Sequence, residues 1–121
     1  MLKKQYRLTK NKEFEAVSQS KKSGYTPVLM FKFIKNNLSY SRFGFVVSNK
    51  VTKKAPQRNL IRRRIREIIR LNIKKISRGY DFIIIVSPKI INKEGKVLPF
   101  SEIEKYVINA FKKANLIWKN F

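Results

Sequence analysis

The chain of 121 residues contains neither cysteine nor histidine, and only 7 of its residues are acidic. Without cysteine it forms no disulfide and no thiolate metal site, which fits the reducing cytoplasm, the compartment that we expect. Without histidine it lacks the side chain that most often acts as a general base near neutral pH and as a metal ligand. The carboxylates are scattered along the chain, so we predict no catalytic residue, no metal site and no cofactor bound by the protein alone.

Long apolar runs are also absent. No stretch approaches the roughly 18 residues of a membrane span, and residues 1–8 lack the apolar segment of a signal peptide. We therefore expect no membrane partner. Hydrophobic residues still make up 43% of the chain and include nine Phe and five Tyr, which is enough for a buried core. The length suits one domain, residues 1–121.

The charge is strongly one-sided. Lys and Arg number 29, and the net charge is +22 at pH 7. Such self-repulsion destabilises a compact fold that has no polyanionic partner, which indicates nucleic acid or an anionic membrane. The basic helix expected over residues 56–73 has an isoleucine-rich face without interfacial Trp, which disfavours a membrane surface. A DNA major groove is disfavoured as well, because this face buries the helix lengthwise and no dimerisation heptads follow.

The strand signals lie in three segments. Residues 28–34 and 42–48 are rich in strand-forming side chains, and we expect them to pair as a hairpin. Gly44 in the second segment indicates a bulge or a close approach of the backbone to another group. Residues 82–86 form a continuous apolar run, which is typical of a strand covered on both faces, so we place it in the middle of the sheet.

Three helices are expected. The first runs from 11 to about 19 with Asn11 as its cap. The second covers 56–73 and begins at a proline, which suits the first helical turn. In the third, Ser101 and Glu104 are spaced as a capping box ahead of an apolar stripe with helical periodicity.

The second helix has two distinct faces when its residues are placed at about 100° intervals. One arc, expected to be buried, carries Ile61, Ile65, Ile68, Ile69 and Asn72. The neighbouring arc forms a cationic stripe of Asn59, Arg62, Arg63, Arg66 and Arg70. Glu67 is the only acid between Lys50 and Gly79, so these cations repel one another unless phosphates neutralise them. Arg is the main cation here, and its guanidinium binds phosphate bidentately. The alternatives are an ordinary solvated face and, for Asn59, a capping role.

The basic helix and the strand before it resemble the signature of the bacterial ribonuclease P protein subunit, in residues 47–50, 54–55 and 58–67. Three other segments agree with this family in order and spacing, namely Arg7-Leu8 with Asn11 and Phe14, residues 42–48, and residues 81–85. The resemblance covers nearly the whole chain.

The resemblance implies an α+β sandwich in the order α-β-β-β-α-β-α, with three helices and a small, mostly antiparallel sheet of about four strands. It also implies a left-handed β-α-β crossover, as in the fold of the second domain of ribosomal protein S5. The general rule for such crossovers favours the right-handed form. The handedness is therefore an expectation from the family alone.

By the same resemblance, the protein is a component of an RNA endonuclease that removes the 5′ leader of precursor tRNA. The RNA subunit carries the chemistry with Mg²⁺, and the partners are ribonuclease P RNA and precursor tRNA. The expected contacts with the catalytic RNA are Arg58, Asn59, Arg62, Arg63, Arg66, Arg70, Lys53 and Lys54. The expected contacts with the leader, in a cleft of the sheet, are Phe14, Phe31, Asn49, Lys50 and Arg7.

The chain departs from the family pattern at two positions. Leu60 stands where the motif Arg-Asn-Arg has its second arginine, so that contact is lost or moved to Arg64. Ser18 stands where a second cleft aromatic is common. From the sequence alone, Phe14 and Phe31 also suit the core. A ribosomal or ribosome-assembly protein that binds rRNA is the alternative function.

Overall fold

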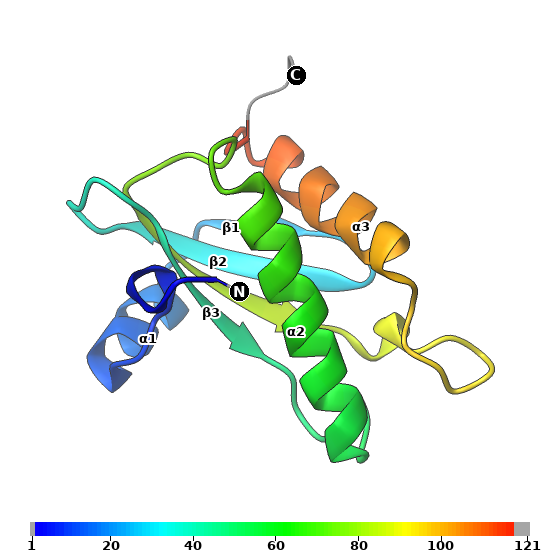
Figure 1. Ribbon diagram of the computed structural model, residues 1–121. Helices are drawn as coiled ribbons and strands as arrows, with labels where there is room; N and C mark the ends of the chain where they lie inside the picture. The colour runs from blue at the N-terminus through cyan, green and yellow to red at the C-terminus, as the bar shows by residue number, and fades with distance from the viewer. Residues whose placement is uncertain (1, 118–121) are drawn as a thin grey trace.

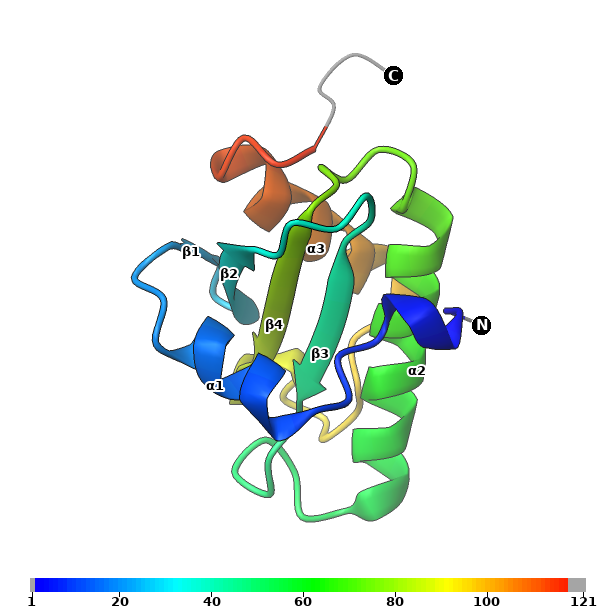
Figure 2. The same cartoon turned by 90° about the vertical axis from the view of Figure 1, so that its left-hand side faces the viewer.

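A four-stranded sheet with helices on both faces forms the protein (Figures 1 and 2). The computed structural model describes residues 2–117. Its strands are β1 (Ser23–Tyr25), β2 (Leu29–Lys35), β3 (Arg42–Val46) and β4 (Tyr80–Val86), and its helices are α1 (Asn11–Ser18), α2 (Ala55–Asn72) and α3 (Phe100–Lys113). Short 3-10 helices lie at Lys4–Tyr6 and Pro88–Ile90. The expected α+β class and element order are confirmed.

The strand order is β1-β2-β4-β3, so β4 lies between the two strands that we expected to pair as a hairpin. That hairpin prediction was wrong, whereas the central place of β4 is confirmed. β2 pairs antiparallel with β4, and β3 pairs parallel with it. β4 takes the central place because its side chains are suited to burial on both faces of the sheet. All residues of β4 except Tyr80 and Ile85 are buried, which suits a strand that has a neighbour on each side.

The connection from β3 through α2 to β4 joins two adjacent parallel strands. Both ribbon views show α2 on the same side of the sheet as α3, and the crossover is left-handed (Figures 1 and 2). The family resemblance implied this hand against the general rule for such units.

The two faces of the sheet have cores of different size. On the side of α2 and α3, aromatic rings dominate, and Phe43 stacks on Phe82 with centroids 5.2 Å apart. On the other side, α1 covers a small cluster of Leu8, Val17 and Ile83. The alternation of side chains along β4 separates the two sets, since neighbouring residues of a strand point to opposite faces. The larger core therefore holds α2, and the smaller core holds α1.

The helix boundaries agree with the sequence except at the caps. Lys10, not Asn11, occupies the N-cap position of α1. The third helix begins two residues early, at Phe100 with Pro99 and not Ser101 as its N-cap, so Ser101 is already inside the helix and the expected capping box is absent. Strand β1 was not located from its own residues, and a further strand in this part of the chain was expected only from the family resemblance. Within residues 2–117, no helix has the length and hydropathy needed to span a membrane.

The apolar face of α2 is as expected, since its buried residues are Ile61, Ile65, Ile68, Ile69 and Asn72. We therefore expect Ile65→Ala to lower the free energy of unfolding by about 2–5 kcal/mol, because it leaves a cavity against the sheet. Leu71, which is 52% exposed on the same helix, provides the control. Urea denaturation should show a change within about 0.5 kcal/mol for Leu71→Ala. Equal losses for both variants would contradict the assignment of the buried face.

Candidate nucleic-acid interface

The cationic stripe of α2 lies beside its buried face. Four of its members line one hollow of about 610 Å³ together with Leu2 and Glu67, namely Asn59, Arg62, Arg63 and Arg66. Arg70, the fifth, is exposed and forms an ion pair with Glu67, with Nη2 and Oε1 2.5 Å apart. The structure therefore brings together the residues that the helical periodicity grouped, and it pairs the last one with the only acid on the helix.

A second hollow, of about 280 Å³, adjoins the first because both share Arg62 and Arg66. It lies between α2, the edge strand β3 and the N-terminal segment, and Arg7 and Phe14 also line it. The N-terminal segment is held there by a hydrogen bond from the Leu8 amide to the Phe43 carbonyl, 2.9 Å long. Three guanidinium groups from two separate parts of the chain thus border one space. We call this space the arginine hollow.

Among residues 2–117, no acidic side chain lines the arginine hollow. The Nε of Arg66 is buried and has no hydrogen-bond partner among the described residues. Its guanidinium lies 5.7 Å from the centroid of the Phe45 ring. Burial, and then the charges of Arg7 and Arg62, lower the pKa of Arg66. Three guanidinium groups that border one space with no acidic residue beside them repel one another, so this arrangement favours an incoming anion with several acceptor oxygens.

The other two arginines are oriented by backbone carbonyls. Arg7 donates from Nε and Nη2 to the Leu2 carbonyl, at 3.1 and 2.8 Å. Arg62 donates to the Asn59 side chain at 3.1 Å and to the Val47 carbonyl at 3.4 Å. These bonds occupy only part of the donors of each guanidinium. The remaining donors are available to a ligand.

Phe14 forms the aromatic wall of the arginine hollow. The ring is partly buried and lies over Gly44, where an added Cβ would be only 2.6 Å from the ring. Gly44 therefore permits the approach of a side chain, which is the kind of close contact its position in the strand indicated. Phe14 and the arginines border the same space.

Phe31 belongs to the core, which was the alternative to leader binding for this residue. It is 0% exposed, and its ring stacks on Phe111 with centroids 4.7 Å apart. The prediction that Phe31 binds the leader was therefore wrong for this arrangement, because no base can reach its faces. The alternation along β2 directs Phe31 towards α3, and the sequence could not tell which face of the strand that helix would cover.

The remaining predicted contacts lie in or after the segment that joins β3 to α2. Asn49, Lys50, Lys53 and Lys54 are all exposed there. Arg58 is partly buried and donates from Nη1 to the Thr52 carbonyl at 3.0 Å, which orders this segment. These residues surround the N-terminal end of α2, next to Arg62.

Arg64 does not join the stripe. Its Nη1 donates to the Leu98 carbonyl, 2.5 Å away, in the segment that leads to α3. Arg64 lines neither of the two hollows described above. Leu60 itself is partly buried.

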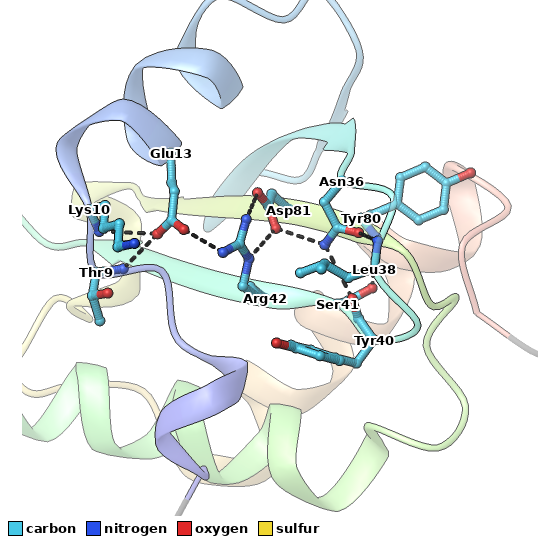
Figure 3. Close-up of polar contacts among 10 residues, drawn as sticks. All are labelled: Thr9, Lys10, Glu13, Asn36, Leu38, Tyr40, Ser41, Arg42, Tyr80 and Asp81. Atoms are coloured by element: carbon cyan, nitrogen blue, oxygen red, sulfur yellow. Dashed lines mark hydrogen bonds and ion pairs between the residues drawn. The ribbon is translucent and has the colours of Figure 1, made fainter.

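A polar network that the sequence did not reveal holds α1 against the sheet (Figure 3). Arg42 on β3 binds both carboxylate oxygens of Asp81 on β4, at 2.8 and 2.7 Å, and also forms an ion pair with Glu13 on α1. Glu13 in turn accepts hydrogen bonds from the Thr9 and Lys10 amides, at 3.2 and 3.1 Å. Because Phe14 follows Glu13, this network sets where the aromatic wall of the hollow stands. Only the parallel register, which places Arg42 beside Asp81, could have revealed it.

Comparison with known proteins agrees with this geometry. The family model described as Ribonuclease P matches residues 2–115. The chain belongs to this family. It is 43% identical over 110 residues to the ribonuclease P protein component of Fusobacterium nucleatum, in an alignment that covers 91% of this chain and 97% of the relative. The ribonuclease P protein component of Clostridium botulinum is 36% identical over 93% of this chain and 97% of its own length.

A solved structure shares the fold. The RNase P protein from Thermotoga maritima, in complex with 1-(4-fluorophenyl)-2-thiourea, has a TM-score of 0.79 at 32% identity and covers 88% of this chain and 98% of its own. Membership of the family implies that the chain acts with the ribonuclease P RNA. These matches give no support to the ribosomal alternative.

The network around Glu13 should make the free energy of unfolding depend on pH. Burial opposes ionisation of Glu13, but hydrogen bonds from the Lys10 and Thr9 backbone and the charge of Arg42 lower its pKa overall. Because its pKa is lower in the folded state, ionised Glu13 stabilises the protein at pH values above its unfolded pKa of about 4.3. This stabilisation is lost as the pH falls through the folded pKa. Glu13→Gln should therefore lower the free energy of unfolding by roughly 1–2 kcal/mol at neutral pH.

Urea denaturation of wild type and Glu13→Gln at neutral and acidic pH measures this effect, and the difference between them should shrink in acid. Glu15→Gln, on the exposed side of the same helix, is the matched control and should match wild type at both pH values. A difference for Glu13→Gln that persists undiminished in acid would mean that the carboxylate charge is not what holds α1.

Proposed function

We propose that this protein binds the catalytic RNA of ribonuclease P through the cationic side of α2 and receives the 5′ leader of precursor tRNA in the arginine hollow. One observation carries the proposal. Three guanidinium groups border one space that no acidic side chain of residues 2–117 lines. Like charges are gathered at close range only where an anion offsets their repulsion, and RNA phosphates supply it.

The contacts divide between two surfaces. On the first, the exposed and partly exposed cations at the N-terminal half of α2 and its preceding segment bind the folded catalytic RNA, namely Lys53, Lys54, Arg58, Arg62, Arg63, Arg66 and, at the far end, Arg70, together with Asn59. On the second, Arg7, Phe14, Asn49 and Lys50 bind the single-stranded leader. Arg62 and Arg66 border both, so a leader in the hollow lies directly against the catalytic RNA.

Stacking on Phe14 allows the second surface to bind leaders of different base sequence. Every base has a π face, so stacking on an aromatic ring adds affinity without demanding a particular base. Arginine contacts with phosphate are equally independent of sequence. A protein built this way accepts the leaders of many different precursor tRNAs.

The protein contributes binding, and the RNA contributes the cleavage chemistry. Residues 2–117 contain no group of three or more acidic side chains that could hold a metal ion. The proposal therefore assigns the Mg²⁺ needed for hydrolysis to sites on the RNA. The side chains of the protein orient the substrate beside those sites.

The salt dependence of RNA binding tests the first surface. If five arginines each neutralise one phosphate, binding of single-stranded RNA should weaken with a log-log slope of about −3.5. Changing both Arg62 and Arg66 to Ala should flatten the slope by about 1.4. Arg64→Ala is the matched control, because its guanidinium is held at Leu98. An equal loss for the control, measured by filter binding across salt concentrations, would contradict the assignment of the stripe.

Leader recognition tests the second surface. Reconstituted with ribonuclease P RNA, the protein should lower the Mg²⁺ concentration needed for leader removal and should tighten binding of precursor tRNA over mature tRNA. Phe14→Leu keeps an apolar side chain over Gly44 but removes the ring, and it should reduce this preference by about fivefold to a hundredfold. Equal affinity of the wild-type holoenzyme for both tRNAs would refute leader binding.

A further inference from the structure

A separate hollow of about 350 Å³ lies at the other end of α2. Its walls come from three parts of the chain, namely the N-terminal 3-10 helix with Tyr6, the loop between β2 and β3 with Tyr40, and residues 73–78 after α2. The volume falls within the range of about 300–1,000 Å³ found for small-molecule sites. None of the expected catalytic-RNA or leader contacts lines it.

The lining has the chemistry of a nucleotide site. Tyr6 and Tyr40 are partly buried and meet edge to face, with ring centroids 5.7 Å apart and planes at 78°. Buried Phe43 and Ile76 provide an apolar floor. Lys74 and Arg78 lie at the rim, and no acidic residue of the described chain lines the space. Rings that stack on a base and cations that bind its phosphate are therefore present together.

The hollow is connected to the arginine hollow by shared walls. Gln5 and Tyr40 also line an intervening depression with the cations Lys4, Arg7 and Lys10. Glu13 and Arg42 line it too, but they form an ion pair with each other. Arg7 and Thr9 of that depression line the arginine hollow in turn. A single strand that leaves Phe14 and follows the cations past Arg7 thus arrives at Tyr40.

We propose that the hollow lined by Tyr6 and Tyr40 is a second base-binding subsite, which takes one unstacked nucleotide of RNA against these rings while Lys74 and Arg78 contact its phosphates. The subsite rests on the proposed function and extends it. The nucleotide comes either from the leader, continued beyond Phe14, or from the catalytic RNA, and the chemistry of recognition is the same. A purely structural role for the two cations is to stabilise the C-terminal end of α2. That role affects stability and leaves RNA binding unchanged.

The test compares the double variant Tyr6→Ala/Tyr40→Ala with Tyr6→Phe/Tyr40→Phe, which keeps both rings. Tyr25→Ala is the matched control, because Tyr25 is 65% exposed on β1, outside the hollow. Each protein is reconstituted with ribonuclease P RNA and titrated with precursor tRNAs whose leaders are shortened one nucleotide at a time. The alanine pair should bind at least about fivefold more weakly, the lower end of one base-aromatic stack, and the other two should match wild type.

The two sources of the nucleotide give different patterns. If the leader supplies it, the loss appears only with leaders above a certain length and is absent with mature tRNA. If the catalytic RNA supplies it, assembly of the protein with that RNA weakens and leader length has no influence. Wild-type behaviour of the alanine pair in both measurements overturns the subsite. Failure of the proposed function itself is distinct, because the wild-type protein would then show no preference for precursor tRNA.

A second measurement covers the case in which the alanine pair does not fold, which circular dichroism shows. The wild-type holoenzyme is photocrosslinked to RNA that carries 5-iodouridine, first in the leader and then in the catalytic RNA, and the crosslinked peptides are mapped. Crosslinks at Tyr6 or Tyr40 support the subsite, and their absence from both RNAs overturns it. A crosslink at Phe14 alone confirms leader binding but refutes this extension.

Discussion

The burial of one isoleucine face against the sheet is the constraint on which the interface depends. Ile61, Ile65, Ile68 and Ile69 are 0% exposed, so α2 cannot turn about its axis without exposing them. Once that face is fixed, helical geometry alone directs Arg62, Arg63 and Arg66 to one side. The apolar side chains thus orient a cationic surface whose members would otherwise repel one another.

Four of the seven acidic residues form contacts within the fold, and among these four Glu67 alone lies beside the cationic stripe. Glu13 and Asp81 are joined to Arg42 inside the fold, Glu67 pairs with Arg70, and Glu104 accepts a bond from the Asn72 side chain at 3.3 Å. With 29 basic residues against 7 acidic ones, most cations have no carboxylate to pair with. Because cations gather where the hollows lie, an RNA ligand removes repulsion in the same place where it makes contacts.

The N-terminal segment connects these features. It bridges to the edge strand β3 at Phe43, it carries Arg7 into the arginine hollow, and it contributes Tyr6 at the opposite end of α2. The outer edge of β3 is thereby partly covered, as the sheet edges of natural proteins usually are. The N-terminal segment also provides one wall of each hollow. These are the hollows in which we propose that RNA binds.

The sequence by itself determined the two faces of α2, the central place of β4 and the excess of cations, because periodicity, continuous apolar character and charge are local properties of the chain. The ribonuclease P resemblance then supplied the handedness and the family. Only the tertiary structure decided that β4 separates β2 from β3, that Phe31 is core while Phe14 borders a hollow, and that Arg42 joins Glu13 to Asp81. Those outcomes depend on which face each strand turns towards a helix and on contacts between distant residues, such as Arg42 and Asp81, which are 39 positions apart and which no local pattern connects.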